Sequence, residues 1–273
     1  MKNAVTIENK VVLITGAFGL IGKTISLAFL QQGAKVILAD VDVRKKSKVE
    51  SELKTFASSK DFLICITDIT NPLACKRCIE AAVKKFKKID VLINNAALDA
   101  KFDKQNISKI NHTRFENFPI KDFERSMKVN VTGLMIMTQA ACRQMLKQGY
   151  GNIINVASTY SLVAPNQNLY DFADGDIKFK PVDYVVSKSF IPNFTKYLAT
   201  FYAKENIRCN AIAPHGIFNE HDDKFVTNFS KLSPMGRMAD KNEIIGPFTF
   251  LASDASSYMT GSVLTVDGGW TAW

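Results

Sequence analysis

The chain has 273 residues, of which 47% are hydrophobic, and it carries a net charge of +9 at pH 7. This length and apolar content suffice for a large buried core. No apolar run approaches the roughly 18 residues of a membrane span. The ten mixed residues before the first apolar segment are too few for a signal peptide. We therefore expect a soluble, cytoplasmic protein without a membrane partner.

The basic residues and the cysteines exclude two further kinds of site. Lysine and arginine gather at 44–48 and 84–88, on expected surface helices that match no known nucleic-acid-binding motif, so we predict no nucleic-acid partner. The positive charge would instead suit an anionic small-molecule substrate. Cys75 and Cys78 form a single C-x-x-C pair with no second pair and no nearby histidine. We therefore predict reduced thiols and no metal site.

The first elements along the chain predict a dinucleotide-binding site. Val11–Thr15 is a continuous apolar strand, as in a buried parallel sheet, and the glycine-rich segment 16–22 leads into a helical pattern that runs to Phe29. Glycines at such a junction let the backbone approach a pyrophosphate at the helix N-terminus. The next apolar strand, 35–39, leads into Asp40. An acidic residue there accepts hydrogen bonds from the ribose of NAD(H) and repels the 2′-phosphate of NADP(H); helix capping is its alternative role.

Two later segments predict a proton-transfer site. Ser158 follows the apolar strand 152–157, at the carboxyl edge where open parallel sheets bind ligands. Tyr184 and Lys188 are four residues apart, so they share one face of a helix. A neighbouring ammonium favours the phenolate, and we therefore expect Lys188 to lower the pKa of Tyr184 toward neutrality.

A series of motifs runs through the whole chain in a fixed order. The motifs are Thr15–Gly22, Asp68–Ile69, Asn94–Ala96, Asn130, Ser158, Tyr184 with Lys188, and a tail that contains 234–237, 250–254, 260–261 and 266–269. Together they resemble the short-chain dehydrogenase/reductase family. The resemblance implies an α/β fold: one Rossmann domain over residues 1–273, with a doubly wound, seven-stranded parallel sheet and helices on both faces.

The resemblance also implies roles for individual residues. Ser158 would hold the substrate oxygen, Tyr184 would exchange a proton with it, and Asn130 would bind a water that links Lys188 to solvent. The expected catalytic residues are thus Asn130, Ser158, Tyr184 and Lys188. The expected cofactor-binding residues are Gly16, Phe18, Gly19, Leu20, Ile21, Gly22, Asp40, Asp68, Ile69, Asn94, Ala96, Tyr184, Lys188, Pro214, Gly216 and Ile217.

Two segments near 99–118 and 166–181 are longer than is usual in the family. They would leave the sheet beside the active site, where loops set specificity. His215 also departs from the family, since glycine usually follows the proline there. The expected substrate residues are Tyr170, Phe172, Lys178, Lys180 and His215. Packing of the loops within the subunit or on a neighbour, and a tolerated loop position for His215, are the alternatives. The glycine spacing G-x-x-G-x-x-G is also unusual for this length and leaves its effect on cofactor choice open.

The segment between Ser158 and Tyr184 further resembles bacterial flagellin-modification and surface-sugar members of the family. This implies an NAD(H)-dependent enzyme that interconverts an alcohol and a ketone on a phosphorylated or nucleotide-linked sugar, with NADP(H) as the alternative cofactor. An NADPH-dependent 3-ketoacyl-carrier reductase and a non-catalytic dinucleotide sensor are the alternative functions. The family also implies a homo-oligomer, for which we favour a homotetramer with Trp270 and Trp273 at an interface.

Overall fold

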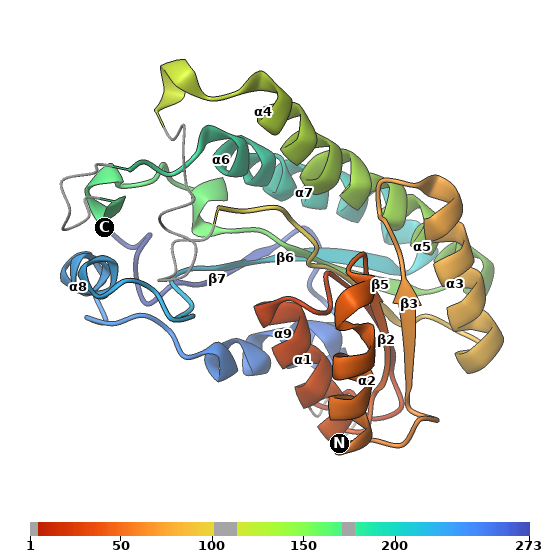
Figure 1. Ribbon diagram of the computed structural model, residues 1–273. Helices are drawn as coiled ribbons and strands as arrows, with labels where there is room; N and C mark the ends of the chain where they lie inside the picture. Colours follow the sequence, from red (N-terminus) through yellow and green to blue (C-terminus); the bar gives the residue numbers. More distant parts are fainter. Residues whose placement is uncertain (1–4, 101–113, 171–177) are drawn as a thin grey trace.

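The computed structural model describes residues 5–100, 114–170 and 178–273, and one parallel sheet runs through them (Figure 1). Its seven strands have the order β3-β2-β1-β4-β5-β6-β7. The strands are β1 Val11–Thr15, β2 Lys35–Asp40, β3 Phe62–Ile66, β4 Val91–Asn94, β5 Gly151–Val156, β6 Ile207–Pro214 and β7 Val263–Val266. The predicted doubly wound, seven-stranded parallel sheet is confirmed.

Helices cover both faces of the sheet, as Figure 1 shows. One face carries α1 (Leu20–Gln31), α2 (Lys46–Lys54) and α9 (Ile245–Ala252). The other face carries α3 (Pro72–Phe86), α5 (Leu134–Gln148) and α7 (Ile191–Tyr202). The remaining α-helices are α4 Ile120–Met127, α6 Val182–Ser189 and α8 Asp223–Leu232.

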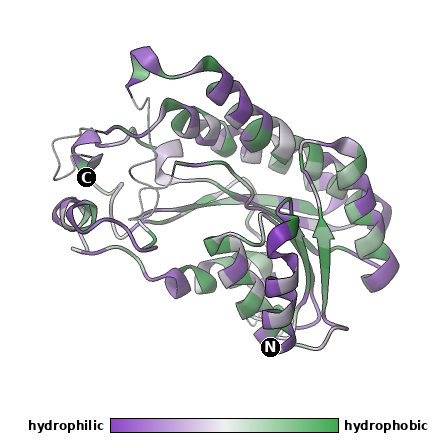
Figure 2. Ribbon diagram, viewed as in Figure 1, coloured by the Kyte–Doolittle hydropathy of each residue, from purple (hydrophilic) through white to green (hydrophobic). Residues whose placement is uncertain are grey.

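The sheet is apolar because parallel strands with helices on both faces are buried on both sides. Every residue of β1 and of β5 is buried, and Figure 2 shows the strands as hydrophobic while the outer faces of the helices are hydrophilic. Side chains alternate between two large cores, so that Val12 and Ile14 pack toward α1 while Val11 and Leu13 pack toward α3. The two cores fix the carboxyl ends of the strands in relation to one another.

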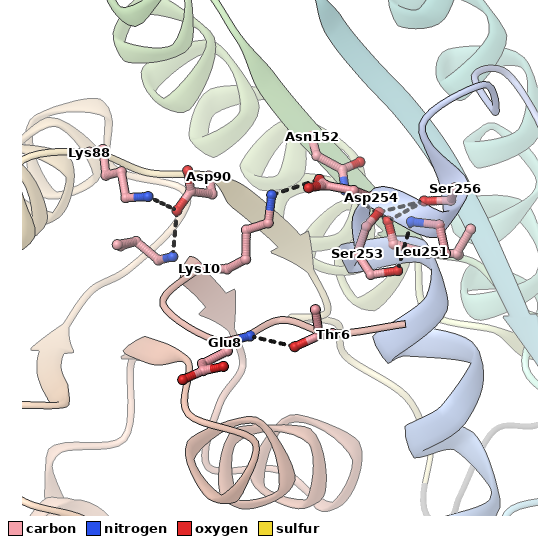
Figure 3. Close-up of polar contacts among 12 residues, drawn as sticks. Thr6, Glu8, Lys10, Lys88, Asp90, Asn152, Leu251, Ser253, Asp254 and Ser256 are labelled. Atoms are coloured by element: carbon pink, nitrogen blue, oxygen red, sulfur yellow. Dashed lines mark hydrogen bonds and ion pairs between the residues drawn. The ribbon is translucent and has the colours of Figure 1, made fainter. Parts of the chain in front are cut away.

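Polar contacts close the amino-terminal edge of the sheet (Figure 3). The buried Asp90 carboxylate accepts a hydrogen bond from the backbone N–H of Val11 at 2.7 Å and lies 2.9 Å from Lys88 Nζ. Lys10, which directly precedes β1, pairs with Asp254 at 2.7 Å. These contacts pair a backbone N–H group and several charged side chains at the amino-terminal edge of the sheet. The loops at the carboxyl edge form the candidate site.

The C-terminal segment folds back onto the loop between β5 and α6. Trp270 is 8% exposed and packs against Phe229, with ring centroids 5.0 Å apart, whereas Trp273 is 83% exposed. Trp270 is therefore buried within its own subunit, and the prediction that it lies at a subunit interface is wrong. The interface prediction now concerns Trp273 alone.

Two further sequence predictions concern thiols and membranes. All five cysteines are free thiols, and four of them are buried. Among the described residues, no helix combines the length and the hydropathy needed to cross a bilayer.

Candidate active site

A cavity of about 790 Å³ opens at the carboxyl edge of the sheet. Its walls come from the loops that follow β1, β2, β3, β4, β5 and β6. The strand order reverses between β1 and β4, and open α/β sheets bind their ligands in the crevice at such a switch point. The glycine-rich loop and the segment between Ser158 and Tyr184 both contribute to its lining.

The glycine-rich loop forms a close backbone cradle. Gly16 has φ +61°, and a Cβ on it would lie 2.7 Å from Ala96 Cα; a Cβ on Gly22 would lie 2.3 Å from Gly16 O. The Asn95 amide donates to the carbonyls of Thr15 and Gly16 and ties the loop to the end of β4. Gly19 caps the start of α1, and Gly16, Gly19, Leu20 and Ile21 line the cavity. This bare backbone at a helix N-terminus fits the pyrophosphate of a dinucleotide.

Asp40 lies at the end of β2 and also lines the cavity. One carboxylate oxygen accepts from Phe18 N at 2.8 Å and the other from Asp42 N at 3.0 Å. The following helical turn is capped by Asp42, not by Asp40, so the alternative capping role is wrong. Lys45 also lines the cavity, and sequence reasoning missed it because it lies within a run of basic residues expected on the surface.

The other predicted cofactor residues divide into two groups. Asp68, Ile69, Ala96, Pro214, Gly216 and Ile217 line the cavity, and so do Tyr184 and Lys188. Phe18, Gly22 and Asn94 do not line it. Asn94 is 2% exposed, and its amide donates to Thr138 and Asn155, since its position in β4 turns the side chain into the protein interior. Phe18 packs in the core beside α1.

The candidate catalytic side chains converge at the floor of the cavity. Tyr184 and Lys188 lie one turn apart on α6, and the Lys188 ammonium is 5.8 Å from the centroid of the Tyr184 ring. Lys188 Nζ donates to the carbonyl of Val156 at 2.6 Å, which fixes the helix to the end of β5. Ser158 stands two residues beyond that carbonyl, and its side chain hydrogen-bonds the Tyr184 phenol. All three side chains line the cavity.

The electrostatic environment of Tyr184 differs from the sequence expectation. Burial raises the pKa of Tyr184 well above its ordinary value, the Asp99 carboxylate raises it further, and the hydrogen bond from Ser158 lowers it. Burial also lowers the pKa of Lys188 to about 8, while Asp99 opposes this effect. The prediction that the pKa of Tyr184 is lowered toward neutrality is thus wrong for the protein by itself, because burial and the Asp99 carboxylate both raise it.

Asn130 lies in a π-helical turn, η4 (Lys128–Gly133), between α4 and α5. Its amide oxygen accepts from Leu98 N at 2.7 Å, and its amide nitrogen donates to Leu98 O and to Ser187 Oγ. Asn130 therefore joins the loop after β4 to α6, one residue from Lys188. Single π-helical turns are frequent at functional sites, and the predicted water-binding role of Asn130 stays a prediction.

The described residues between Ser158 and Tyr184 contribute to the cavity wall. Tyr160 and Tyr170 line it and share a hydrogen bond of 2.9 Å between their hydroxyls. Lys180 lines it as well and pairs with Asp99 at 2.6 Å. Sequence reasoning missed Tyr160 and Asp99, although each closely follows a recognised motif. Lys178 is buried but does not line the cavity, and Phe172 lies outside the described residues.

His215 lines the cavity near Tyr160. Its Nδ1 lies 2.5 Å from the Thr159 hydroxyl, and its Nε2 is buried without a hydrogen-bond partner among the described residues. The ring lies 4.4 Å from Trp270, measured between ring centroids. Burial lowers the pKa of His215 to about 4, so the imidazole is neutral at physiological pH. His215 is thus a packed, neutral wall residue.

Comparisons with known proteins agree with this geometry. A family model described as enoyl-(acyl carrier protein) reductase matches residues 16–271. The chain is 30% identical to 7alpha-hydroxysteroid dehydrogenase of Bacteroides fragilis over 97% of this chain and 95% of that protein. It is 30% identical to 2-dehydro-3-deoxy-D-gluconate 5-dehydrogenase of Dickeya dadantii, over 99% and 98%. It is also 30% identical to post-translational flagellin modification protein A of Campylobacter coli, over 97% and 99%.

A solved structure is similar over the same length. A short-chain dehydrogenase from Leptospira borgpetersenii with bound NAD+ superposes with a TM-score of 0.80 and 31% identity, covering 97% of this chain and 93% of that one. The fold is therefore shared with a protein whose structure holds bound NAD+.

Proposed function

The chain belongs to the short-chain dehydrogenase/reductase family, and we propose that it is an NAD(H)-dependent oxidoreductase that interconverts a secondary alcohol and a ketone on a sugar derivative. As a family member it is an oxidoreductase of CH–OH groups; the sugar and the choice of NAD(H) are the proposal. The observation that carries it is the convergence of Ser158, Tyr184 and Lys188 at a cavity with a glycine cradle on one side and a polar wall on the other.

The roles of the residues follow from their positions. Ser158 would hold the substrate oxygen by a hydrogen bond, and Tyr184 would give a proton to that oxygen or take one from it. Lys188, held by the Val156 carbonyl, would stabilise the phenolate that forms. The nicotinamide, when bound, supplies or accepts the hydride. Because burial keeps the phenol protonated, the protein by itself is in the state needed to donate a proton to a ketone.

Asp40 supports NAD(H) as the cofactor. Two backbone N–H groups hold its carboxylate at the cavity wall, where the 2′-phosphate of NADP(H) would meet a negative charge. Lys45 also lines the cavity and favours NADP(H), the second candidate. The ratio of kcat/KM for NADH and NADPH decides between them, and a preference for NADPH would refute this part of the proposal.

A polar wall supports a sugar as the substrate. Asp99, Tyr160, Tyr170 and Lys180 present hydroxyl, carboxylate and ammonium groups to the cavity, which suits a ligand with many hydroxyls. Arg125 and Lys128 also line it and support an anionic group on the ligand. The relatives named for a sugar acid and for flagellin modification support the same class. A steroid is the contrasting candidate, supported by the Bacteroides relative and by the rings of Phe225 and Phe229 in the wall.

The remaining alternatives have weaker support. The description of the matching family model favours an acyl-carrier substrate, whose acidic carrier protein would suit a net charge of +9. A dinucleotide sensor without turnover is disfavoured because Asn130, Ser158, Tyr184 and Lys188 are all present. We also propose that the enzyme acts in the cytoplasm as a homotetramer, which light scattering would test.

One screen tests the substrate class. NADH absorbance is followed with sugar phosphates, nucleotide sugars, steroid alcohols and acyl thioesters, using the wild type and Tyr184→Phe in parallel. Turnover of sugar derivatives by the wild type supports the proposal, while turnover of steroids or acyl thioesters alone refutes it. If Tyr184→Phe turned over substrate as fast as the wild type, the assignment of Tyr184 as a catalytic residue would be refuted instead.

A further inference from the structure

An ion pair between a buried lysine and a partly exposed aspartate lies directly against the candidate proton-transfer residue. Lys180 Nζ is 2.6 Å from Asp99 Oδ1 and 4.2 Å from the centroid of the Tyr184 ring. The Lys180 side chain is 5% exposed, and that of Asp99 is 37% exposed. Both residues belong to the two segments that are longer than the family norm. The ammonium is thus held on the aromatic ring of Tyr184 by a carboxylate from a second loop.

We propose that Lys180 is a positioning residue that sets the proton affinity of Tyr184, and that Asp99 is the counter-charge that limits this effect. The inference rests on the proposed role of Tyr184 in proton transfer and is independent of which alcohol is the substrate. It assigns an electrostatic role at the reaction centre to the loop between Ser158 and Tyr184, in addition to substrate contact.

The distances support an electrostatic effect of the Lys180 charge on the ionisation of Tyr184. An ammonium on the ring face attracts the electron-rich ring and favours the phenolate over the phenol. Lys180 is closer to the Tyr184 ring than Lys188 is, at 4.2 Å against 5.8 Å from the ring centroid. Both side chains are buried, so solvent screens their charges little. Asp99 opposes them, since its carboxylate raises the pKa of Tyr184.

Other titratable groups also face this cluster. Tyr160 and Tyr170 hydrogen-bond each other, and burial raises the pKa of both phenols, that of Tyr160 to about 12. His215 is neutral, as described above. On α6, Asp183 accepts a hydrogen bond from Ser126 Oγ and adds a negative charge near Asp99. Lys188 completes the group.

A test follows because the two partners carry opposite charges. Lys180→Met removes the positive charge and leaves Asp99 beside the phenol, so the pH midpoint of alcohol oxidation should rise by about one unit. Asp99→Asn removes the negative charge that opposes the ammonium at Tyr184, so the midpoint should fall by a similar amount. Lys180→Arg keeps the charge and should stay near the wild type, and the double variant Asp99→Asn/Lys180→Met should fall between the single variants. The measurement is the pH profile of kcat/KM with NAD+ and any alcohol that is turned over.

A second measurement requires no substrate. The near-ultraviolet absorbance of tyrosinate is titrated with bound NAD+ for each protein and for the same protein carrying Tyr184→Phe, and the difference isolates Tyr184. The same order is expected, with Asp99→Asn titrating below the wild type and Lys180→Met above it. Shifts of both single variants in the same direction, or equal losses of kcat with unmoved midpoints, would overturn the proposal and leave a purely structural ion pair. Retained turnover in Tyr184→Phe would instead show that the proposed function is wrong.

Discussion

The neutral, buried His215 predicts a specific loss of stability in acid. The pKa of His215 is about 4 in the folded protein, against an ordinary value of 6.5. Below pH 6.5, His215 in the unfolded chain therefore binds a proton that it does not bind in the folded protein. The free energy of unfolding therefore falls as the pH drops from 6.5 toward 4. Well above pH 6.5 the histidine is neutral in both states, so it does not make the stability depend on pH. The full loss is roughly 3 kcal/mol.

The substitution His215→Phe tests this linkage. It keeps an aromatic ring against Trp270 and Phe229, and the lost contact with Thr159 gives an offset that does not depend on pH. Urea unfolding is followed by tryptophan fluorescence from pH 7 to pH 4.5 at fixed protein concentration, because oligomerisation shifts apparent stability. The wild type should lose about 2 kcal/mol more than the variant over this range. Parallel stability curves for the two proteins would show that His215 is not buried in its neutral form.

Three further substitutions test the cofactor site and the reaction centre. Asp40→Asn should lower the preference for NADH over NADPH by roughly tenfold to a hundredfold, since hydrogen bonds to charged groups contribute about 1.5–3 kcal/mol; an unchanged kcat/KM ratio would contradict the role of Asp40. Tyr184→Phe should lower kcat by at least about a hundredfold while the Kd for NADH, measured by fluorescence, changes little; a comparable loss of binding would indicate a structural role. Gly16→Ala should abolish NADH binding, because Gly16 has φ +61° and a Cβ would lie 2.7 Å from Ala96 Cα. Its control is Gly246→Ala in α9, where nothing lies within 4 Å of the added Cβ and the expected change is a stabilisation of about 0.5–1 kcal/mol.

Local patterns in the sequence predicted the parts of the structure that local forces determine. The apolar strand Val11–Thr15, the glycine turn after it and the helix that follows depend on neighbouring residues, and so does the placement of Tyr184 and Lys188 on one helix face. The family resemblance carried by the order of the motifs then predicted the parallel sheet. These predictions hold because parallel strands, tight turns and i,i+4 pairs each leave a periodic or compositional signal.

The sequence did not predict contacts between segments that lie far apart along the chain. Asp99 and Lys180 are 81 positions apart, and neither neighbourhood indicates that they form a pair. The same limit explains the wrong interface prediction for Trp270, because the burial of this residue depends on α8 and the loop before α6. It also explains Tyr184, because the burial and the Asp99 carboxylate that raise its pKa cannot be read from the residues next to it in the sequence. Charge and spacing alone suggested a lowered pKa, since they do not report burial.

The buried environment of Tyr184 and Lys188 has a consequence for cofactor binding. Burial favours the neutral phenol and also lowers the pKa of Lys188 to about 8, so the ion pair of phenolate and ammonium is disfavoured in the protein by itself. Oxidised nicotinamide carries a positive charge, and a positive charge bound beside Tyr184 and Lys188 would lower the pKa of both groups. Binding of NAD+ should therefore release protons near pH 8, whereas NADH, whose nicotinamide is neutral, should release fewer. Calorimetry in buffers of different ionisation enthalpy measures this release. Equal proton release with both cofactors would show that the charge of the nicotinamide does not act on Tyr184 and Lys188.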